Sequence, residues 1–141
     1  MNIDLEKIKK LPPDVQKDFM RTFLKYSEKK KESKIQTDFL TFVKHMWPDF
    51  IEGSHHKIVA DKFNKLAQGK IKRLIINMPP RHTKSEFASY LLPAWFLGKY
   101  PDKKIIQTAH TAELAVGFGR KVRNLVNSAD YKAVFPNVSL Q

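Results

Sequence analysis

The segment from Met78 to Ser85 combines residue types that bind phosphate groups. It reads Met-Pro-Pro-Arg-His-Thr-Lys-Ser, and Lys84-Ser85 matches the end of the phosphate-loop pattern G-x-x-x-x-G-K-[ST]. In such loops the lysine reaches the β- and γ-phosphates of a nucleotide, and the hydroxyl ligates the Mg²⁺ that bridges them. Lys84 is therefore a candidate catalytic residue and Ser85 a candidate metal ligand, with ATP and Mg²⁺ as the expected cofactors.

The residues around this pair could complete an anion site. Backbone N–H groups of a tight turn, with a helix N-terminus behind them, attract phosphate. Arg81 adds a second cation that can hold a phosphate oxygen through two N–H groups, so we count it as catalytic too. We expect the nucleotide to be bound by Pro80, Arg81, His82, Thr83, Lys84, Ser85 and Glu86.

Both glycines of the phosphate-loop pattern are replaced in this chain. Met78 stands at the first glycine position and Thr83 at the second. If Thr83 has a positive φ, its β-branched side chain costs on the order of 1 kcal/mol or more. The pattern alone also fits a proline-rich turn followed by a capped helix, without any ligand.

The elements that would position this segment follow from hydrophobic periodicity. After a short leader at residues 1–13, apolar residues at helical spacing predict helices over about 14–31, 36–47 and 54–68. Pro48 should end the second helix, Ser54 should cap the third, and Gly69 should close it from a left-handed position. Residues 1–53 therefore form a helical lead-in, and residues 54–141 a second region.

The second region alternates between strand-like and helix-like segments. The apolar runs at 74–76 and 104–109 predict strands, and 138–140 could begin a third. Helices are expected over about 83–97, with a kink at Pro93, and over about 111–127 with Thr111 as N-cap, before a short turn at 131–135. This order is typical of an α/β parallel sheet.

Several stretches together resemble the terminase large subunits of tailed bacteriophages. Members of that family commonly carry the sequence PPRHGKSE as their Walker A segment, and this chain has Pro-Pro-Arg-His-Thr-Lys-Ser-Glu over residues 79–86. Further matching stretches are 73–78, 93–98, 101–103, 107–110 and 118–123, so the resemblance covers most of residues 55–140. Thr83, in place of the glycine usual in the family, is the one departure that bears on nucleotide binding.

The resemblance implies a fold, an activity and partners. The fold would be the front part of a P-loop NTPase sheet of the RecA/ASCE-like kind, an incomplete domain cut before the Walker B strand. The whole protein would be a hydrolase that couples ATP hydrolysis to packaging of viral DNA into the procapsid, with a C-terminal nuclease. The implied partners are double-stranded DNA, the terminase small subunit, the portal protein and further copies in a ring, in the host cytoplasm.

Other residues have weaker claims to a role. His55 and His56 stand where related motors recognise adenine, so His56 is a candidate nucleotide contact, although a surface pair fits equally. Thr108 and His110 could sense the nucleotide, and Arg120 could act on a neighbouring subunit, but a buried strand and a solvated helix face explain them as well.

Composition and absent motifs limit the alternatives. The 141 residues carry a net charge of +12, which favours polyanion contacts, and contain neither cysteine nor an apolar run long enough to span a membrane. No apolar run ends in the acidic pair that ATP hydrolysis needs, so we expect the 141 residues to hydrolyse ATP poorly. Nothing in the sequence matches the C-terminal nuclease that the resemblance implies, with its clustered acidic residues for two metals, so we also expect no nuclease activity. The rival interpretations are another P-loop DNA motor such as a helicase, or a basic nucleic-acid-binding module without catalysis.

Overall fold

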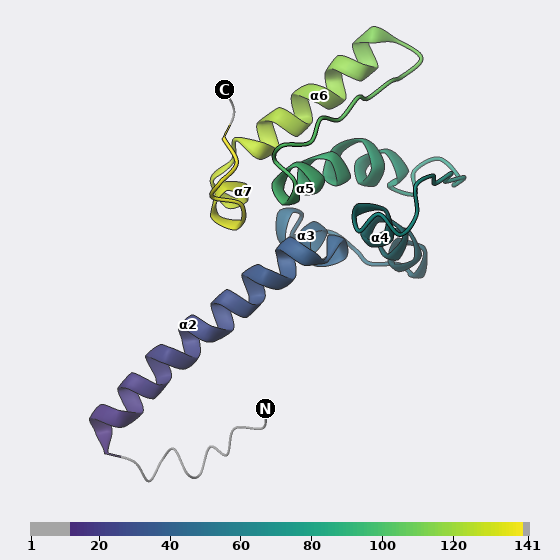
Figure 1. The fold of residues 1–141 in the computed structure, drawn as a ribbon. Helices are drawn as coiled ribbons and strands as arrows, with labels where there is room; N and C mark the ends of the chain where they lie inside the picture. Colours follow the sequence, from purple (N-terminus) through teal and green to yellow (C-terminus); the bar gives the residue numbers. More distant parts are fainter. Residues whose placement is uncertain (1–11, 140–141) are drawn as a thin grey trace. The chain divides into compact units, whose positions relative to one another are not determined.

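The computed structural model describes residues 12–139, and every regular element in that range is helical (Figure 1). Seven segments follow one another without an intervening strand. They are α2 (Pro13–Thr37), α3 (Phe39–Met46), α4 (Ser54–Ala67), the π-helix η1 (Glu86–Leu91), α5 (Leu92–Lys99), α6 (Ala112–Val126) and α7 (Ala129–Val134). None of the helices within residues 12–139 has the length and hydrophobicity needed to span a bilayer.

The prediction of an α/β fold with a parallel sheet is wrong for the described residues. Neither 74–76 nor 104–109 forms a strand. Leu74 and Ile76 pack against the core, whereas Ile75 between them is 86% exposed. In the other run Ile106 is 90% exposed. These segments are therefore irregular connections without a ladder partner among residues 12–139, and the P-loop sheet expected from the resemblance is absent from that range.

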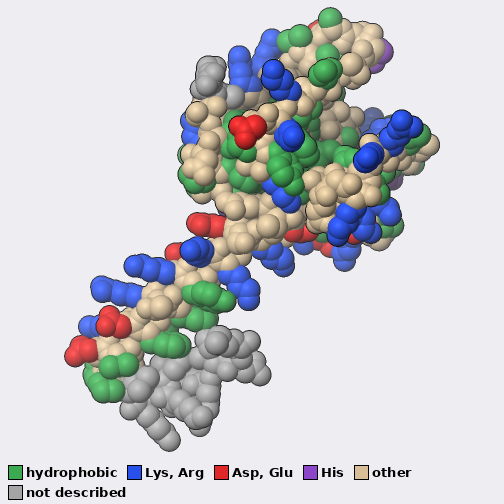
Figure 2. Space-filling view, viewed as in Figure 1, with side chains coloured by type: hydrophobic (Ala, Val, Ile, Leu, Met, Phe, Trp, Pro, Cys, Tyr) green, Lys and Arg blue, Asp and Glu red, His purple; other side chains and the backbone are tan. Residues whose placement is uncertain are grey.

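The chain divides into two compact units, which we describe separately. The first comprises Met1–Ser33, whose described part is most of α2, and the second comprises Lys34–Gln141. The leader expected at residues 1–13 lies almost entirely outside the described residues, as does Leu140 of the possible third strand. Along α2, basic and hydrophobic side chains are both exposed (Figure 2), the latter including Phe19, Met20 and Leu24.

The core of the second unit is built from aromatic rings. Phe39 of α3 lies edge-on to three of them, with centroid distances of 5.1 Å to Phe63, 5.4 Å to Phe87 and 5.6 Å to Trp95. Edge-to-face pairs of this kind add to the free energy gained by burial. Phe39, Phe63 and Trp95 are all buried, whereas Leu114 of α6 is 40% exposed.

Local capping explains several helix boundaries. Asp38 accepts a hydrogen bond from the Thr41 amide at 2.8 Å and starts α3, while Thr111 caps α6 as expected. Gly69 has a φ of 73° after α4, which confirms its left-handed closing role. The cap of α4 is Gly53 rather than Ser54, which is the first helical residue.

The helix behind the Lys84-Ser85 pair is not a simple α-helix. It begins at Lys84, passes through the π-helical turn η1 and continues as α5. Pro93 lies in the first turn of α5, so the expected kink is realised as this change of helix type. Proline has no N–H and its ring crowds the carbonyl four residues earlier, and a wider π-turn before it relieves both effects.

Candidate functional site

The turn before this helix holds two residues in a left-handed conformation. Arg81 has a φ of 65° and Thr83 a φ of 57°, and both are non-glycine residues. Such positions each cost on the order of 1–3 kcal/mol and persist only where the surroundings enforce them. Thr83, being β-branched, is the more costly of the two. Strain of this kind concentrates at ligand-binding sites, so the turn is a candidate ligand-binding site.

The helix begins immediately after Thr83. The Thr83 carbonyl accepts a hydrogen bond from the Phe87 amide at 2.9 Å, which closes the first helical turn. The amides of that turn, at Lys84, Ser85 and Glu86, have no acceptor inside their own helix. Phe87 is only 2% exposed and packs on Phe39, so the core fixes where these amides lie.

Cationic and hydroxyl side chains surround a hollow at this turn. Its volume is about 300 Å³, and its lining residues are Pro79, Arg81, His82, Thr83, Lys84, Ser85 and Glu86. The Lys84 ammonium bends back over the turn and donates to the Met78 carbonyl at 3.4 Å. No hydrogen bond or ion pair joins the Arg81 guanidinium or the Ser85 hydroxyl to another of residues 12–139. Six of the seven residues expected to bind the nucleotide therefore line one hollow, and Pro79 lines it with them. The seventh, Pro80, is exposed and does not line the hollow.

His56 of α4 is tied to the turn rather than open to a ligand. Its Nδ1 accepts a hydrogen bond from the Gly53 amide at 2.9 Å, so the neutral ring carries its proton on Nε2. That Nε2–H donates to the Thr83 hydroxyl at 2.6 Å, and the hydroxyl in turn donates to the His82 carbonyl at 2.7 Å. Both nitrogens of His56 are thus engaged. Its predicted contact with the nucleotide itself stays a prediction.

The His56 ring is enclosed by aromatic neighbours. It is 6% exposed, with ring centroids 4.8 Å from Phe50 and 5.1 Å from Phe87. Burial, and next the nearby His55, hold the pKa of His56 below its usual value of 6.5, so the ring favours its neutral form. This neutral form is the one that can accept from Gly53 and donate to Thr83 at the same time.

A second, more apolar hollow adjoins the turn. It measures about 320 Å³ and lies between α4 and the segment before the turn, with lining residues His55, Ile58, Val59, Lys62 and 74–78. The Nε2 atom of His55 is buried without a hydrogen-bond partner among residues 12–139. His55 also lies edge-on to His82 of the turn at 5.7 Å. A flat heterocycle placed here would be next to the phosphate hollow.

Glu86 already has a partner on another helix. Its Oε1 atom lies 3.0 Å from the Lys121 ammonium of α6, and both side chains are partly exposed. Lys121 also lies 5.8 Å from the Tyr90 ring. The expected role of Glu86 at the nucleotide stays a prediction, and the ion pair with Lys121 joins the start of the helix to α6.

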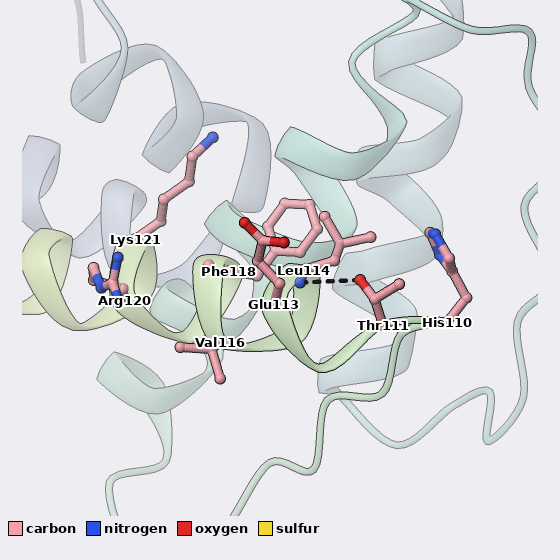
Figure 3. A pocket seen from close by; sticks show the side chains of 9 residues that line it. His110, Thr111, Glu113, Leu114, Val116, Phe118, Arg120 and Lys121 are labelled. Atoms are coloured by element: carbon pink, nitrogen blue, oxygen red, sulfur yellow. Dashed lines mark hydrogen bonds between the residues drawn. The ribbon is translucent and has the colours of Figure 1, made fainter.

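The remaining sequence candidates do not line the hollow at the turn. Thr108 is exposed, and a hollow of about 640 Å³ along α6 contains His110 and Arg120 but none of residues 78–86 (Figure 3). In that view Thr111 accepts from the Leu114 amide, which is an N-cap contact. Only one helix and its cap line this hollow, and no cluster of three potential metal ligands occurs anywhere in residues 12–139.

Two features of the site were missed by sequence reasoning. The left-handed Arg81 carries no sequence signal, because arginine is seldom found at positive φ. The contact between His56 and Thr83 spans 27 residues and depends on how α4 packs against the turn.

Comparisons with protein-family models, with curated proteins and with solved structures found no match.

Proposed function

We propose that residues 78–86 bind the phosphates of a nucleotide, in a chain that serves an ATP-driven DNA-packaging motor of the terminase large-subunit kind. The observation that carries the proposal is the strained turn at Arg81 and Thr83, which leads directly into a helix start. The cationic side chains of Arg81 and Lys84 line the hollow at this turn. Alternating left- and right-handed residues turn successive N–H groups toward one point, where they attract an anion. The resemblance of residues 79–86 to the terminase Walker A segment points to the same ligand.

The residues divide the work of binding a triphosphate. The amides of Lys84, Ser85 and Glu86 donate to its oxygens, while Lys84 and Arg81 neutralise its charge. The Ser85 hydroxyl is free to reach a Mg²⁺ that the nucleotide carries, and that ion would supply charge neutralisation between the phosphates. The apolar hollow beside His55 has the size and lining for the base. Double-stranded DNA is the proposed partner of the exposed lysine and arginine side chains that give the chain its net charge of +12.

Calorimetric titration with Mg²⁺–ATP and with tripolyphosphate tests this proposal. We expect both to bind, and Lys84→Ala to weaken binding about tenfold or more, because a charge-assisted hydrogen bond is worth about 1.5–3 kcal/mol. Lys30→Ala, which removes an equal charge from exposed α2, is the matched control and should change the affinity little. Equal losses from the two variants would show that only net charge attracts the ligand, and would overturn the proposal.

A further inference from the structure

The conformation of Thr83 needs an external restraint. A φ of 57° is comfortable for glycine but costly for a β-branched residue, whose Cβ substituents crowd the backbone. Within the turn itself the Thr83 hydroxyl has only its bond to the neighbouring His82 carbonyl, which spans a single residue. The remaining contact of that hydroxyl is with His56 of α4, which precedes Thr83 by 27 residues.

His56 is built to act as such a restraint. Gly53 fixes its Nδ1, Phe50 and Phe87 enclose its ring, and its Nε2–H therefore points in one direction. Phe87 is also the residue whose amide bonds to the Thr83 carbonyl at 2.9 Å. Thr83 is thus held from both ends, by its hydroxyl through His56 and by its carbonyl through Phe87.

We propose that His56 is a positioning residue that holds Thr83 in the left-handed conformation, and so does for this turn what glycine does at that position in a phosphate loop. The inference rests on the proposed function for its consequence, namely that the held turn is the one that binds phosphate. In this role His56 acts through Thr83 and needs no contact of its own with the ligand. The two residues depend on each other: Thr83 needs the restraint that His56 supplies, and His56 supplies it only through the Thr83 hydroxyl.

A double-mutant cycle tests the pair without any ligand. Thr83→Gly adopts a positive φ unaided, so His56→Ala should raise the unfolding equilibrium constant at least about fivefold more in the wild-type background than in the Thr83→Gly background. Ile58→Ala, on the exposed face of the same helix, should have equal effects in both backgrounds. An equal effect of His56→Ala in both would overturn the proposal.

A second variant guards against His56→Ala failing to fold, because that ring is buried. Thr83→Val keeps the β-branched shape at a half-buried position and removes only the hydroxyl. We expect it to weaken tripolyphosphate binding about fivefold or more, and Thr83→Gly to bind at least as well as the wild-type chain. Wild-type affinity in Thr83→Val would contradict the role of the hydroxyl contact.

The two readouts separate the restraint from the proposed function. If the wild-type chain binds no tripolyphosphate while the unfolding cycle shows coupling, the proposed function fails and the restraint stands. If tripolyphosphate binds to all variants equally and the cycle shows no coupling, the restraint fails and the phosphate site stands. The ¹⁵N shifts of the His56 ring give an independent check, since we expect the proton on Nε2 and an unprotonated Nδ1.

Discussion

At the residue scale, the turn concentrates conformational strain and unpaired donors in a few positions. Arg81 and Thr83 are held at positive φ, and the Arg81 guanidinium and the Ser85 hydroxyl have no protein partner among residues 12–139. A fold tolerates such an arrangement when surrounding contacts enforce it. At Thr83 these contacts come from Phe87, through its amide, and from His56, through the threonine hydroxyl.

The protonation of His56 gives the turn a defined pH dependence. The pKa of this ring in the folded chain lies below 6.5, chiefly because burial disfavours the charged form and then because of His55. His82 also lowers the pKa and Glu52 raises it. The unfolded chain therefore takes up the proton first as the pH falls. The stabilisation is complete above about pH 6.5 and is lost progressively below it.

Urea unfolding at a series of pH values measures this effect. We expect the difference in free energy of unfolding between the wild-type chain and His56→Ala to shrink as the pH falls below about 6.5. Ile58→Ala, which removes no titratable group from the exposed face of α4, should keep the pH dependence of the wild-type chain. A difference that stays constant or grows toward acid pH would be inconsistent with a buried neutral His56.

At the element scale, the segment from 71 to 78 leads into the turn without belonging to a sheet. Its alternate residues Leu74, Ile76 and Met78 are partly buried, while Ile75 is exposed. One face of the segment therefore packs on the helical core and the other meets solvent. Met78 ends the segment, and its carbonyl accepts a hydrogen bond from the Lys84 ammonium of the turn.

Two substitutions separate this arrangement from a buried strand. Ile75→Ala should change the free energy of unfolding by no more than about 0.5 kcal/mol, because that side chain is already exposed. Phe87→Ala should cost about 3–5 kcal/mol through the cavity that it leaves. Chemical denaturation of both variants gives the two values. A cost of several kcal/mol for Ile75→Ala would indicate the sheet that the sequence suggested.

The sequence predicted the helices better than their connections. Periodic apolar residues located α4, and capping chemistry located the start of α6 at Thr111 and the closing Gly69. The run Leu74-Ile75-Ile76 suggested a strand buried on both faces, because apolar runs do not reveal whether a partner strand is present. The contact of His56 with Thr83 could not be foreseen either, since it arises from packing between distant elements.

At the scale of the whole molecule, the net charge of +12 favours contacts with polyanions. Lys29, Lys30 and Lys31 of α2 are exposed. If they contact double-stranded DNA, replacing all three by alanine should reduce the slope of log affinity against log salt by about one for each lysine that touches a phosphate. Fluorescence anisotropy with a labelled duplex over a salt series measures that slope.

A control substitution makes the DNA experiment specific to α2. Lys132→Ala on α7 removes an exposed charge elsewhere, and its ammonium bonds only to Asn127 among residues 12–139. We expect it to leave the slope unchanged. If the triple variant keeps the wild-type slope, Lys29–Lys31 do not contact DNA phosphates. That result would say nothing against the phosphate site at the turn.

The most direct test of the central claim follows the backbone amides of the turn during a titration. In ¹H–¹⁵N spectra, adding tripolyphosphate or Mg²⁺–ATP should shift the amide signals of Arg81, Thr83, Lys84, Ser85 and Glu86 together, with one saturation curve. The same signals should move little in Lys84→Ala. Shifts spread over exposed lysines without saturation at the turn would contradict the account, because they would show that the polyphosphate meets only the basic surface.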